Sequence, residues 1–463
     1  GKICAIGASL ATAWPAYGQF LPNLYPFPNR TGFVETYNVK GKGIDLRGPF
    51  FRPLGSNGRS CASCHRPAQG WSISPNELKR RFELTRGLDP IFRPNDGANC
   101  DHDIDTSTVE GRRRAYRLLL NRGLIRIALA VPATAEFNVL TVSNPYGCND
   151  TETLSMYRRS LPATNLRFLT TVMWDGRESS PQTGTRKITN GTNPSDLLAD
   201  LAQQALDATN GHAQAATPLT TQQQQEIVEF EVGLATAQAY DYRAGSLDAH
   251  GARGGPVILG TGTRRAFFVG INDPLGGNPL GTAFTPAIFN LFGAWADRYE
   301  ERSGERARIA RGEALFNSKP INITGVAGLN DDLNVESIPG TCGTCHDAFN
   351  VGNHSLSVPL NIGVSDTDSP LNVDYLPVFT LQNKTTLEIK MTTDPGRALV
   401  TGLWKDIGKV KGPILRGLAS RAPYFHNGSA QSLNDVLDFY DMRFHIGFTP
   451  EEKKDLIAFL NAL

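Results

Sequence analysis

Two copies of one five-residue motif constrain this chain more than any other feature of its sequence. The motif C-x-x-C-H stands at 61–65 and again at 342–346. With 7 Cys and 8 His in 463 residues, chance would produce roughly 0.002 such motifs. Two thiols three positions apart can form thioethers to one porphyrin, and the next histidine then offers its imidazole to iron. The sequence therefore predicts two covalently bound haem c groups. The predicted attachment residues and iron ligands are Cys61, Cys64, His65, Cys342, Cys345 and His346.

Two other uses of a C-x-x-C pair agree less well with the sequence. A redox-active pair does not require histidine at the next position in both copies. A cysteine-based zinc site usually needs a second ligand pair nearby. The first motif has only Cys100 within reach along the chain, and the second has only His354.

The composition excludes several classes of protein. Hydrophobic residues make up 40%, charged residues 20%, and the net charge is +1. This balance argues against a disordered chain and against a polybasic nucleic-acid binder. No run of 18 apolar residues exists, so we expect no membrane span. The sequence leaves the oligomeric state undetermined.

The first residues are typical of a secretory signal. Lys2 precedes an apolar stretch from Ile3 to Trp14, and A-T-A at 11–13 fits a cleavage site. We therefore expect a periplasmic or secreted protein in an oxidising compartment. The alternative is a small buried helix or strand near the start.

The motifs and the glycine-dense stretch between them suggest a division of the chain. Residues 1–18 are the predicted signal remnant, and 19–245 form the N-terminal haem domain. Residues 246–300 are a glycine-rich linker with inter-domain loops, and 301–463 form the C-terminal haem domain.

Helical periodicity dominates the pattern of apolar residues, and residues 131–170 are irregular with short strand-like runs such as Glu136–Val142. We therefore expect a mainly α fold with two cytochrome c-like haem domains and long irregular loops. The predicted helices are Asn76–Leu84, Arg112–Ala130, Pro194–Ala208, Thr221–Tyr242, Arg302–Phe316 and Glu451–Leu463.

Two cysteines lie outside both motifs and outside the predicted leader, which contains Cys4. Cys100 and Cys148 occupy irregular segments. In an oxidising compartment they are expected to form a disulfide. The alternative is a pair of buried free thiols.

From about Gly32 to Leu463 the chain resembles the bacterial di-haem cytochrome c peroxidase and MauG superfamily. Besides the two haem motifs, the match rests on M-W-D-G-R-E at 173–178 and D-P-G-R at 394–397. It also rests on G-P-I-L-R at 412–416, which leads into A-P-Y-F-H-N-G-S at 422–429. The resemblance implies that H2O2 or O2 reacts at the N-terminal haem and that the C-terminal haem relays electrons. It also implies that Trp174 lies between them; the alternative is that Trp174 is only a core residue.

The resemblance also addresses the sixth ligand of the second haem. Peroxidases of the family place methionine fourteen residues after the histidine of P-Y-F-H, whereas MauG-type proteins have tyrosine there. Counting from His426 leads to Tyr440. A phenolate is an anionic donor that favours ferric and higher states. Met442 and His445 remain alternatives, and Tyr440 can instead be a packing residue.

The other side of the first haem departs from the family pattern. Familiar peroxidases have glutamate ten residues after the glutamine of a Q-A pair. Here Gln204-Ala205 matches the pair, but position 214 is Gln. His212 is the nearby imidazole, and histidine is a residue type suited to acid–base catalysis. It can equally ligate iron or lie in a surface loop.

Three further features have expected roles. Arg397 and Arg416 are candidates for pairing with haem propionates, because arginine binds carboxylates bidentately. His426 is expected to be a structural hydrogen-bonding residue. The run D-H-D-I-D at 101–105 lacks the glycine and glutamate of an EF-hand loop, so a calcium ion is left open.

The functional hypothesis is a di-haem oxidoreductase of the peroxidase/MauG type. Its catalytic candidates are His212, Trp174 and Gln204. Its partners would be H2O2 or O2, and either a small redox protein or a protein substrate. The alternatives are a pure electron-transfer cytochrome and an O2-dependent di-haem oxygenase.

Overall fold

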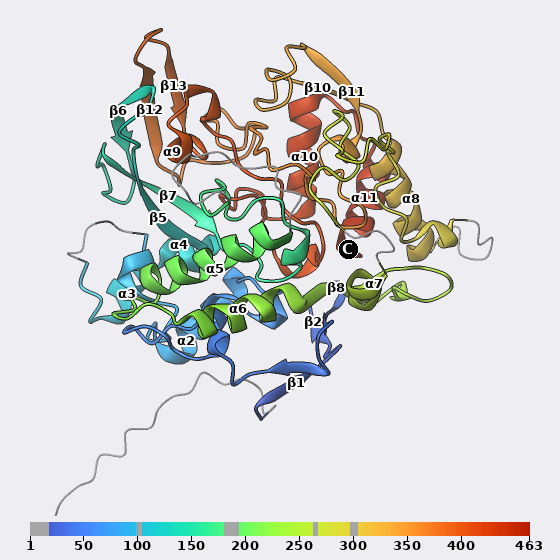
Figure 1. Ribbon diagram of the computed structural model, residues 1–463, viewed down its shortest axis with the longest axis horizontal. Helices are drawn as coiled ribbons and strands as arrows, with labels where there is room; N and C mark the ends of the chain where they lie inside the picture. The colour runs from blue at the N-terminus through green and yellow to red at the C-terminus, as the bar shows by residue number, and fades with distance from the viewer. Residues whose placement is uncertain (1–17, 99, 101–103, 180–193, 263–266, 297–303) are drawn as a thin grey trace, which may run out of the picture.

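A computed structural model describes residues 18–98, 100, 104–179, 194–262, 267–296 and 304–463 (Figure 1). The predicted signal segment, apart from Gly18, lies outside the described residues. Among the described residues, no helix combines the length and the apolar composition needed to cross a bilayer.

The strands form several small antiparallel sheets. Two sheets are assembled from segments far apart in sequence: β2-β3-β8-β9 and β13-β12-β6. The other pairs are β1 with β4, β5 with β7, and β10 with β11. The strand bounds are β1 Phe20–Pro22, β2 Phe27–Pro28, β3 Gly32–Asn38, β4 Gly43–Asp45, β5 Leu124–Ala130, β6 Phe137–Ser143, β7 Thr153–Arg159, β8 Leu234–Asp241, β9 Gly245–Ser246, β10 Ile321–Thr324, β11 Ser337–Gly340, β12 Val378–Asn383 and β13 Ile389–Thr392.

The helices lie around these sheets and cover the two motif segments. α5 and α6 lie side by side, and α8 packs on α11. The helix bounds are α1 Cys61–Cys64, α2 Pro75–Thr85, α3 Val109–Ala115, α4 Arg117–Arg122, α5 Pro194–Gly211, α6 Thr221–Gly233, α7 Gly255–Thr261, α8 Glu305–Ser318, α9 Ala398–Thr401, α10 Leu433–Phe444 and α11 Pro450–Asn461.

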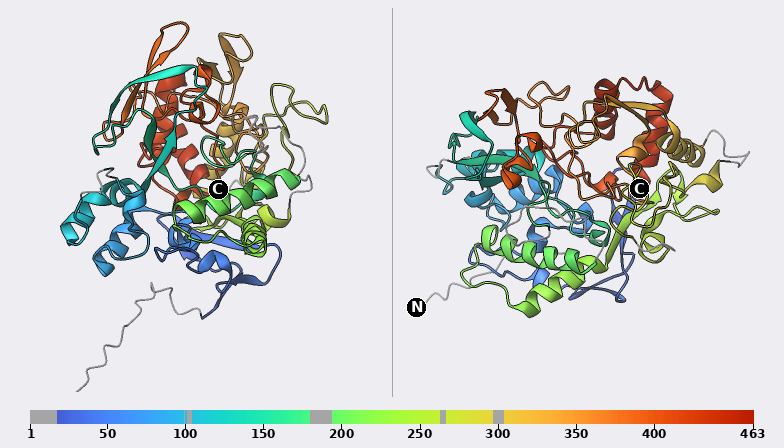
Figure 2. Two further views of the ribbon diagram at one scale, coloured as in Figure 1. Left: turned by 60° about the vertical axis from the view of Figure 1, so that its left-hand side comes forward. Right: turned by 45° about the horizontal axis from the view of Figure 1, so that its top comes forward.

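The expectation of a mainly α fold is wrong. The structure is 31% helical and 18% strand. The missed strands depend on partners far away in sequence, which helical periodicity cannot reveal. Figure 2 shows β6 of the N-terminal half beside β12 and β13 of the C-terminal half.

Two predicted helices are too long, because their last residues form strands that pair with distant segments. The helix expected over Arg112–Ala130 ends near Gly123, whose left-handed backbone stops it. The chain then continues as β5. The helix expected over Thr221–Tyr242 ends at Gly233, and the alanine-rich run that follows is β8. Pairing of β8 with β3 overrides the helix propensity of alanine.

The other predicted helices are present, with small shifts at their ends. α11 begins with Thr449 as its N-cap, Pro450 in the first turn and a reciprocal bond with Glu452, as the cap-like sequence predicts. α2 begins at Pro75 after the Ser74 cap. Helix ends set by local capping chemistry are therefore predicted well.

The disulfide between Cys100 and Cys148 is confirmed, with Cα atoms 4.8 Å apart. It joins the segment before α3 to the approach to β7. This link ties the sheet β5-β7 to the loop that follows the first motif.

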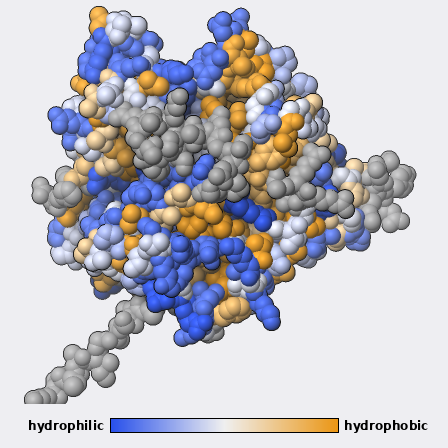
Figure 3. All heavy atoms as spheres, viewed as in Figure 1, coloured by the Kyte–Doolittle hydropathy of each residue, from blue (hydrophilic) through white to orange (hydrophobic). Residues whose placement is uncertain are grey.

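The core of the C-terminal half includes part of the glycine-rich stretch. Phe289, Phe292 and Trp295 are buried against α8 and α11. The upper corners of the molecule carry β13-β12-β6 on one side and β10-β11 on the other, and the surface is hollowed between them (Figure 3).

Candidate functional site: two cavities joined by a tryptophan

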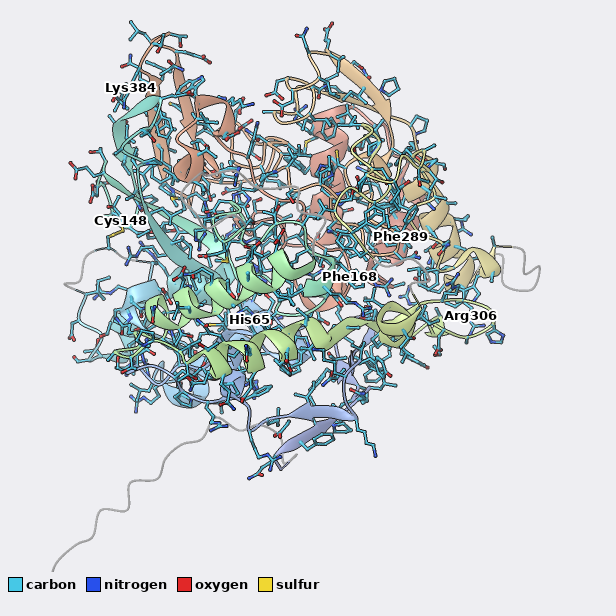
Figure 4. All side chains as sticks on the ribbon, in the orientation of Figure 1. His65, Cys148, Phe168, Phe289, Arg306 and Lys384 are labelled. Carbon is cyan, nitrogen blue, oxygen red and sulfur yellow. A yellow bond between two sulfur atoms is a disulfide. The ribbon has the colours of Figure 1, made fainter. Side chains whose placement is uncertain are left out.

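The first C-x-x-C-H motif lies against a cavity in the N-terminal half. Cys61, Cys64 and His65 line this first cavity, whose volume is about 180 Å³. Residues of α5 and α6 complete its wall, and Figure 4 shows His65 beside these two helices. Protein interiors leave few gaps larger than a water molecule, so a cavity of this size marks a binding site.

The second motif lies against a second cavity in the C-terminal half. Cys342, Cys345 and His346 line it, and its volume is about 230 Å³. The cysteines begin and follow a single 3-10 turn, η7 (Cys342–Thr344). Each motif therefore has its own cavity.

The two motifs share the local structure that turns the chain at each cavity. Ser60 and Ser63 form a capping box around α1. Thr341 and Thr344 form the equivalent box around η7. In each turn the hydroxyl before the second cysteine accepts from the N–H of the residue before the first cysteine, at 3.0 Å in both motifs.

The two motif histidines are held in the same way. In each, Nδ1 donates to a main-chain carbonyl six residues later: Trp71 O at 3.0 Å from His65, and Gly352 O at 2.6 Å from His346. A carbonyl only accepts, so Nδ1 carries the proton and Nε2 keeps its lone pair. Burial lowers the pKa of His65 to about 4 and also lowers the pKa of His346. Both imidazoles are therefore neutral and ready to bind a metal through Nε2.

These residues fit haem c. The four motif cysteines form no disulfide, and burial raises the pKa of each thiol. For Cys342 and Cys345 that pKa is about 12. Each cavity thus presents two neutral thiols and one oriented imidazole, which are the groups that covalent haem attachment uses.

Trp174 lines both cavities. It is 9% exposed, and its indole Nε1 donates to Arg159 O at 2.8 Å. The ring meets His426 edge-on, with centroids 6.0 Å apart. The W-D-G-R segment therefore contributes Trp174 to the walls of both cavities.

A buried ion cluster holds this segment in place. Asp175 follows Trp174 and accepts from Arg158 at 2.5 Å and from Arg177 at 3.0 Å. Arg158 also binds Asp394 of the D-P-G-R segment through two bonds of 2.7 and 2.8 Å. These cations hold the pKa of both carboxyls below the usual range, despite burial. Two of the family motifs thus meet at Arg158.

Of the three candidate ligands for the second haem, only one lines the second cavity. Tyr440 on α10 lines the cavity, and burial raises its pKa. Phe425, Phe439 and Phe444 surround its ring. Met442 is 49% exposed and His445 is exposed, and neither lines the cavity. The geometry therefore favours Tyr440.

His212 lines the first cavity and contacts the buried pair of Asp96 and Arg59. Its Nδ1 is 3.0 Å from Asp96 Oδ2. Asp96 also accepts from the buried Arg59. Burial of Asp96 favours its neutral form, but His212 and Arg59 outweigh burial and lower its pKa. Gln204, which lies on α5, lines the same cavity.

Glu231 also lines the first cavity, and sequence reasoning missed it. It lies in the last turn of α6, is 5% exposed, and its Oε2 has no hydrogen-bond partner. Burial raises its pKa to about 8, so the carboxyl is protonated at neutral pH. The available signal was a glutamate four residues after the buried Ile227, and therefore on the same helix face.

Of the two arginines predicted to bind propionates, only one lines a cavity. Arg416 lines the first cavity and is 2% exposed, and its Nε has no partner. Arg397 lines neither cavity; its guanidinium donates to Asp175 O at 3.0 Å. His426 lines the second cavity and lies 3.3 Å from Ser365 Oγ.

The predicted calcium run falls largely outside the described residues, which omit 101–103. Within the residues that are described, no group of three or more His, Cys, Asp or Glu side chains is arranged to hold a metal ion. His354 lines the second cavity, 3.6 Å from Asp347.

Comparison with known proteins identifies relatives of this chain, although no family model matches it. Cytochrome-c peroxidase IdrP1 of Pseudomonas sp. (strain SCT) is 42% identical over 81 residues, which are 15% of this chain and 21% of the relative. IdrP1 of Denitromonas iodatirespirans is 40% identical over 70 residues, or 13% of this chain and 19% of the relative. The chain thus spans about a fifth of the length of the curated relatives it matches.

A solved MauG-like protein associated with microbial copper homeostasis aligns over 98% of this chain and 95% of its own, at 15% identity and a TM-score of 0.36. Over the matched segments the chain is similar to curated cytochrome-c peroxidases, which agrees with the family resemblance of its motifs. The names of its curated relatives agree with the predicted class, an oxidoreductase of the peroxidase or MauG-like type.

Proposed function

We propose that this protein is a periplasmic or secreted di-haem oxidoreductase. H2O2, or alternatively O2, reacts in the first cavity, and electrons from an external donor arrive through the second. The donor is a small redox protein or a residue of a protein substrate. The observation that carries this proposal is that Trp174 lines both motif-bearing cavities.

Haem iron, when bound, supplies the position at which the oxidant binds and exchanges electrons one at a time. The chain supplies the route between the two cavities. Trp174 is a planar, oxidisable side chain, and its N–H is fixed on the Arg159 carbonyl. The buried Asp175 and Arg158 pair keeps the indole in one orientation.

Proton handling belongs to the first cavity. Reduction of H2O2 to two water molecules consumes two electrons from the donor and two protons. His212 holds its Nδ1 on Asp96, which leaves Nε2 to accept and return a proton. Glu231 keeps a proton on its carboxyl at neutral pH and can donate it. Gln204 offers an amide that can hydrogen-bond the bound oxidant.

The second cavity has a different task. Its wall is aromatic and aliphatic around Tyr440. We propose that the Tyr440 oxygen ligates the second haem and stabilises its oxidised states.

Low-temperature electron paramagnetic resonance of the purified protein tests the proposal. We expect two haems per chain by pyridine haemochrome assay, one of them high-spin, and a spectral change on addition of H2O2. Two low-spin ferric haems without a response to peroxide would reject the enzyme. That result would instead favour a pure electron-transfer cytochrome with His212 as a ligand, since His212 lines the first cavity.

The Trp174→Phe variant tests the electron route separately. It should retain both haems and the reaction of the first one with H2O2. Reoxidation of the reduced second haem by peroxide should slow at least tenfold. An unchanged rate would show that electrons pass elsewhere.

A further inference from the structure

Three buried cations line both cavities. Arg159 ends β7, Lys411 precedes the P-I-L-R segment, and Arg421 follows the 3-10 turn Leu418–Ser420. Their exposed fractions are 5%, 7% and 9%. Distant segments of the chain thus bring three positive side chains to the wall between the cavities. We call these residues, Arg159, Lys411 and Arg421, the inter-cavity cations.

The inter-cavity cations have no carboxylate partner among the described residues. The Arg159 guanidinium donates only to main-chain carbonyls, of Ile73, Arg122, Gly123 and Arg421. Lys411 Nζ donates to Thr171 O at 3.1 Å. The Arg421 guanidinium donates to the carbonyls of Ile414, Arg416 and Gly417.

Arg158, the neighbour of Arg159, shows how unusual this is. Arg158 is equally buried but binds two carboxylates, Asp175 and Asp394. Burial without such partners lowers the pKa of Lys411 to about 7, of Arg159 to about 9 and of Arg421 to about 10. A buried cation is costly unless an anion accompanies it.

We propose that the inter-cavity cations form one shared anion site, which receives propionate carboxylates from both haems. This inference rests on the proposed function, because it requires a haem in each cavity. Each haem carries two propionates, and three cations that line both cavities can be reached from either side. Arg416, which lines the first cavity alone, would serve the first haem only.

The shared site has an electrostatic consequence. A cation beside a haem stabilises the reduced iron, because reduction removes one positive charge. Removal of one inter-cavity cation should therefore lower the reduction potentials of both haems. Removal of Arg416 should lower only that of the first haem.

Spectroelectrochemical titration of the full-length, haem-loaded protein tests this inference. In Lys411→Met, both midpoint potentials should fall relative to the wild type. Lys409→Met is the matched control, since Lys409 is 3% exposed, lies two residues away, pairs with Asp406 and lines neither cavity. Its potentials should not change. Arg416→Met should lower the first potential alone.

A second pair of variants guards against a folding defect in Lys411→Met. Arg421→Gln should lower both potentials, whereas Arg421→Lys, which keeps the charge, should leave both closer to the wild-type values. With two haems bound, a shift of only one potential in Arg421→Gln, or of neither, overturns the shared site. A wild-type protein that lacks two covalent haems by haemochrome assay and mass would instead overturn the proposed function.

Discussion

The two cavities are alike on one side and different on the other. Both have a capping box around the cysteines and a histidine held by the carbonyl six residues later. An aromatic ring lies near each histidine: Phe50 beside His65, and Phe316, which lines the second cavity, beside His346. The first cavity also carries His212 and Glu231, whereas the second carries His354, His426 and a Tyr440 that phenylalanines surround.

This difference suggests a division of labour. Under the proposed function, chemistry on peroxide needs groups that hold and release protons, which His212 and Glu231 would supply in the first cavity. An electron relay is better served by an apolar surrounding with a fixed ligand, as Tyr440 would be in the second. Trp174, the Arg158 ion cluster and the inter-cavity cations belong to the wall between the cavities.

The largest expected effect is the loss of one haem. The Cys345→Ala and Cys64→Ala variants should each lose a thioether bond, and the double variants Cys342→Ala/Cys345→Ala and Cys61→Ala/Cys64→Ala should each retain one covalent haem instead of two. Mass spectrometry of the unfolded protein measures this. The double variant Cys100→Ser/Cys148→Ser, which removes the disulfide, is the control and should keep both haems. Two covalent haems in any motif double variant would contradict the assignment of that cavity.

The next largest effect should be a loss of stability that involves both cavities, because Arg158 joins two segments of the wall between them. Arg158→Met leaves Asp175 and Asp394 buried without their main cation, which typically costs about 3–5 kcal/mol. Arg177→Met removes a cation that is 20% exposed and also contacts Asp175, and should cost roughly 1 kcal/mol. Denaturant unfolding gives both values. Equal losses in the two variants would show that Arg158 is not the central ion of the cluster.

Removal of the disulfide should destabilise the protein without changing either cavity. Cys100 and Cys148 close a loop with a sequence separation of 48, so its loss should cost roughly 2–4 kcal/mol. Thermal unfolding of Cys100→Ser/Cys148→Ser measures the loss, and the absorption spectra of both haems should match the wild type. An altered spectrum would show that this bond shapes the first cavity.

Glu231, which lines the first cavity, should make the free energy of unfolding of the protein depend on pH. Its folded pKa is raised to about 8, whereas an unfolded glutamate ionises near 4.3. The free energy of unfolding is therefore not reduced by Glu231 at low pH, where the carboxyl is neutral in both states. It falls as the pH rises from about 4.3 to 8, because the unfolded state then loses its proton and the folded state keeps it. Glu231→Gln avoids this loss and should gain up to about 1.4 kcal/mol per pH unit over the wild type in that range.

Thermal unfolding of Glu231→Gln at pH 5 and pH 8 checks this expectation. The control is Glu229→Gln on the same helix, where the side chain is exposed; it should show no such trend. A difference between Glu231→Gln and the wild type that stays constant with pH would mean that Glu231 is ionised in the folded protein.

The smallest expected change in stability is that of Tyr440→Phe, which removes one oxygen and keeps the ring packing against Phe444. Its effect should be spectroscopic: the absorption and resonance signals of the second haem change, and those of the first do not. If the second haem keeps its spectrum, Tyr440 is a packing residue.

Local sequence determined a large part of the site. The two motifs, their caps and the disulfide partners depend on neighbouring residues or on a short inventory of cysteines. Helices such as α2 and α11 were equally predictable, because Ser74 and Thr449 cap them by contacts within one turn. A place for Trp174 between two haems is implied by the family resemblance, not by the pattern of residues, and it stays a prediction.

Only the tertiary structure decided the remaining features. β5 and β8 appeared helical because strand pairing with β7 and β3 is not written in the local pattern. Glu231 and the inter-cavity cations are ordinary charged residues in the sequence, and burial beside a cavity gives them their chemistry. The sequence by itself therefore determined what each cavity can attach, whereas long-range packing decided which polar groups surround it and which cations the two cavities share.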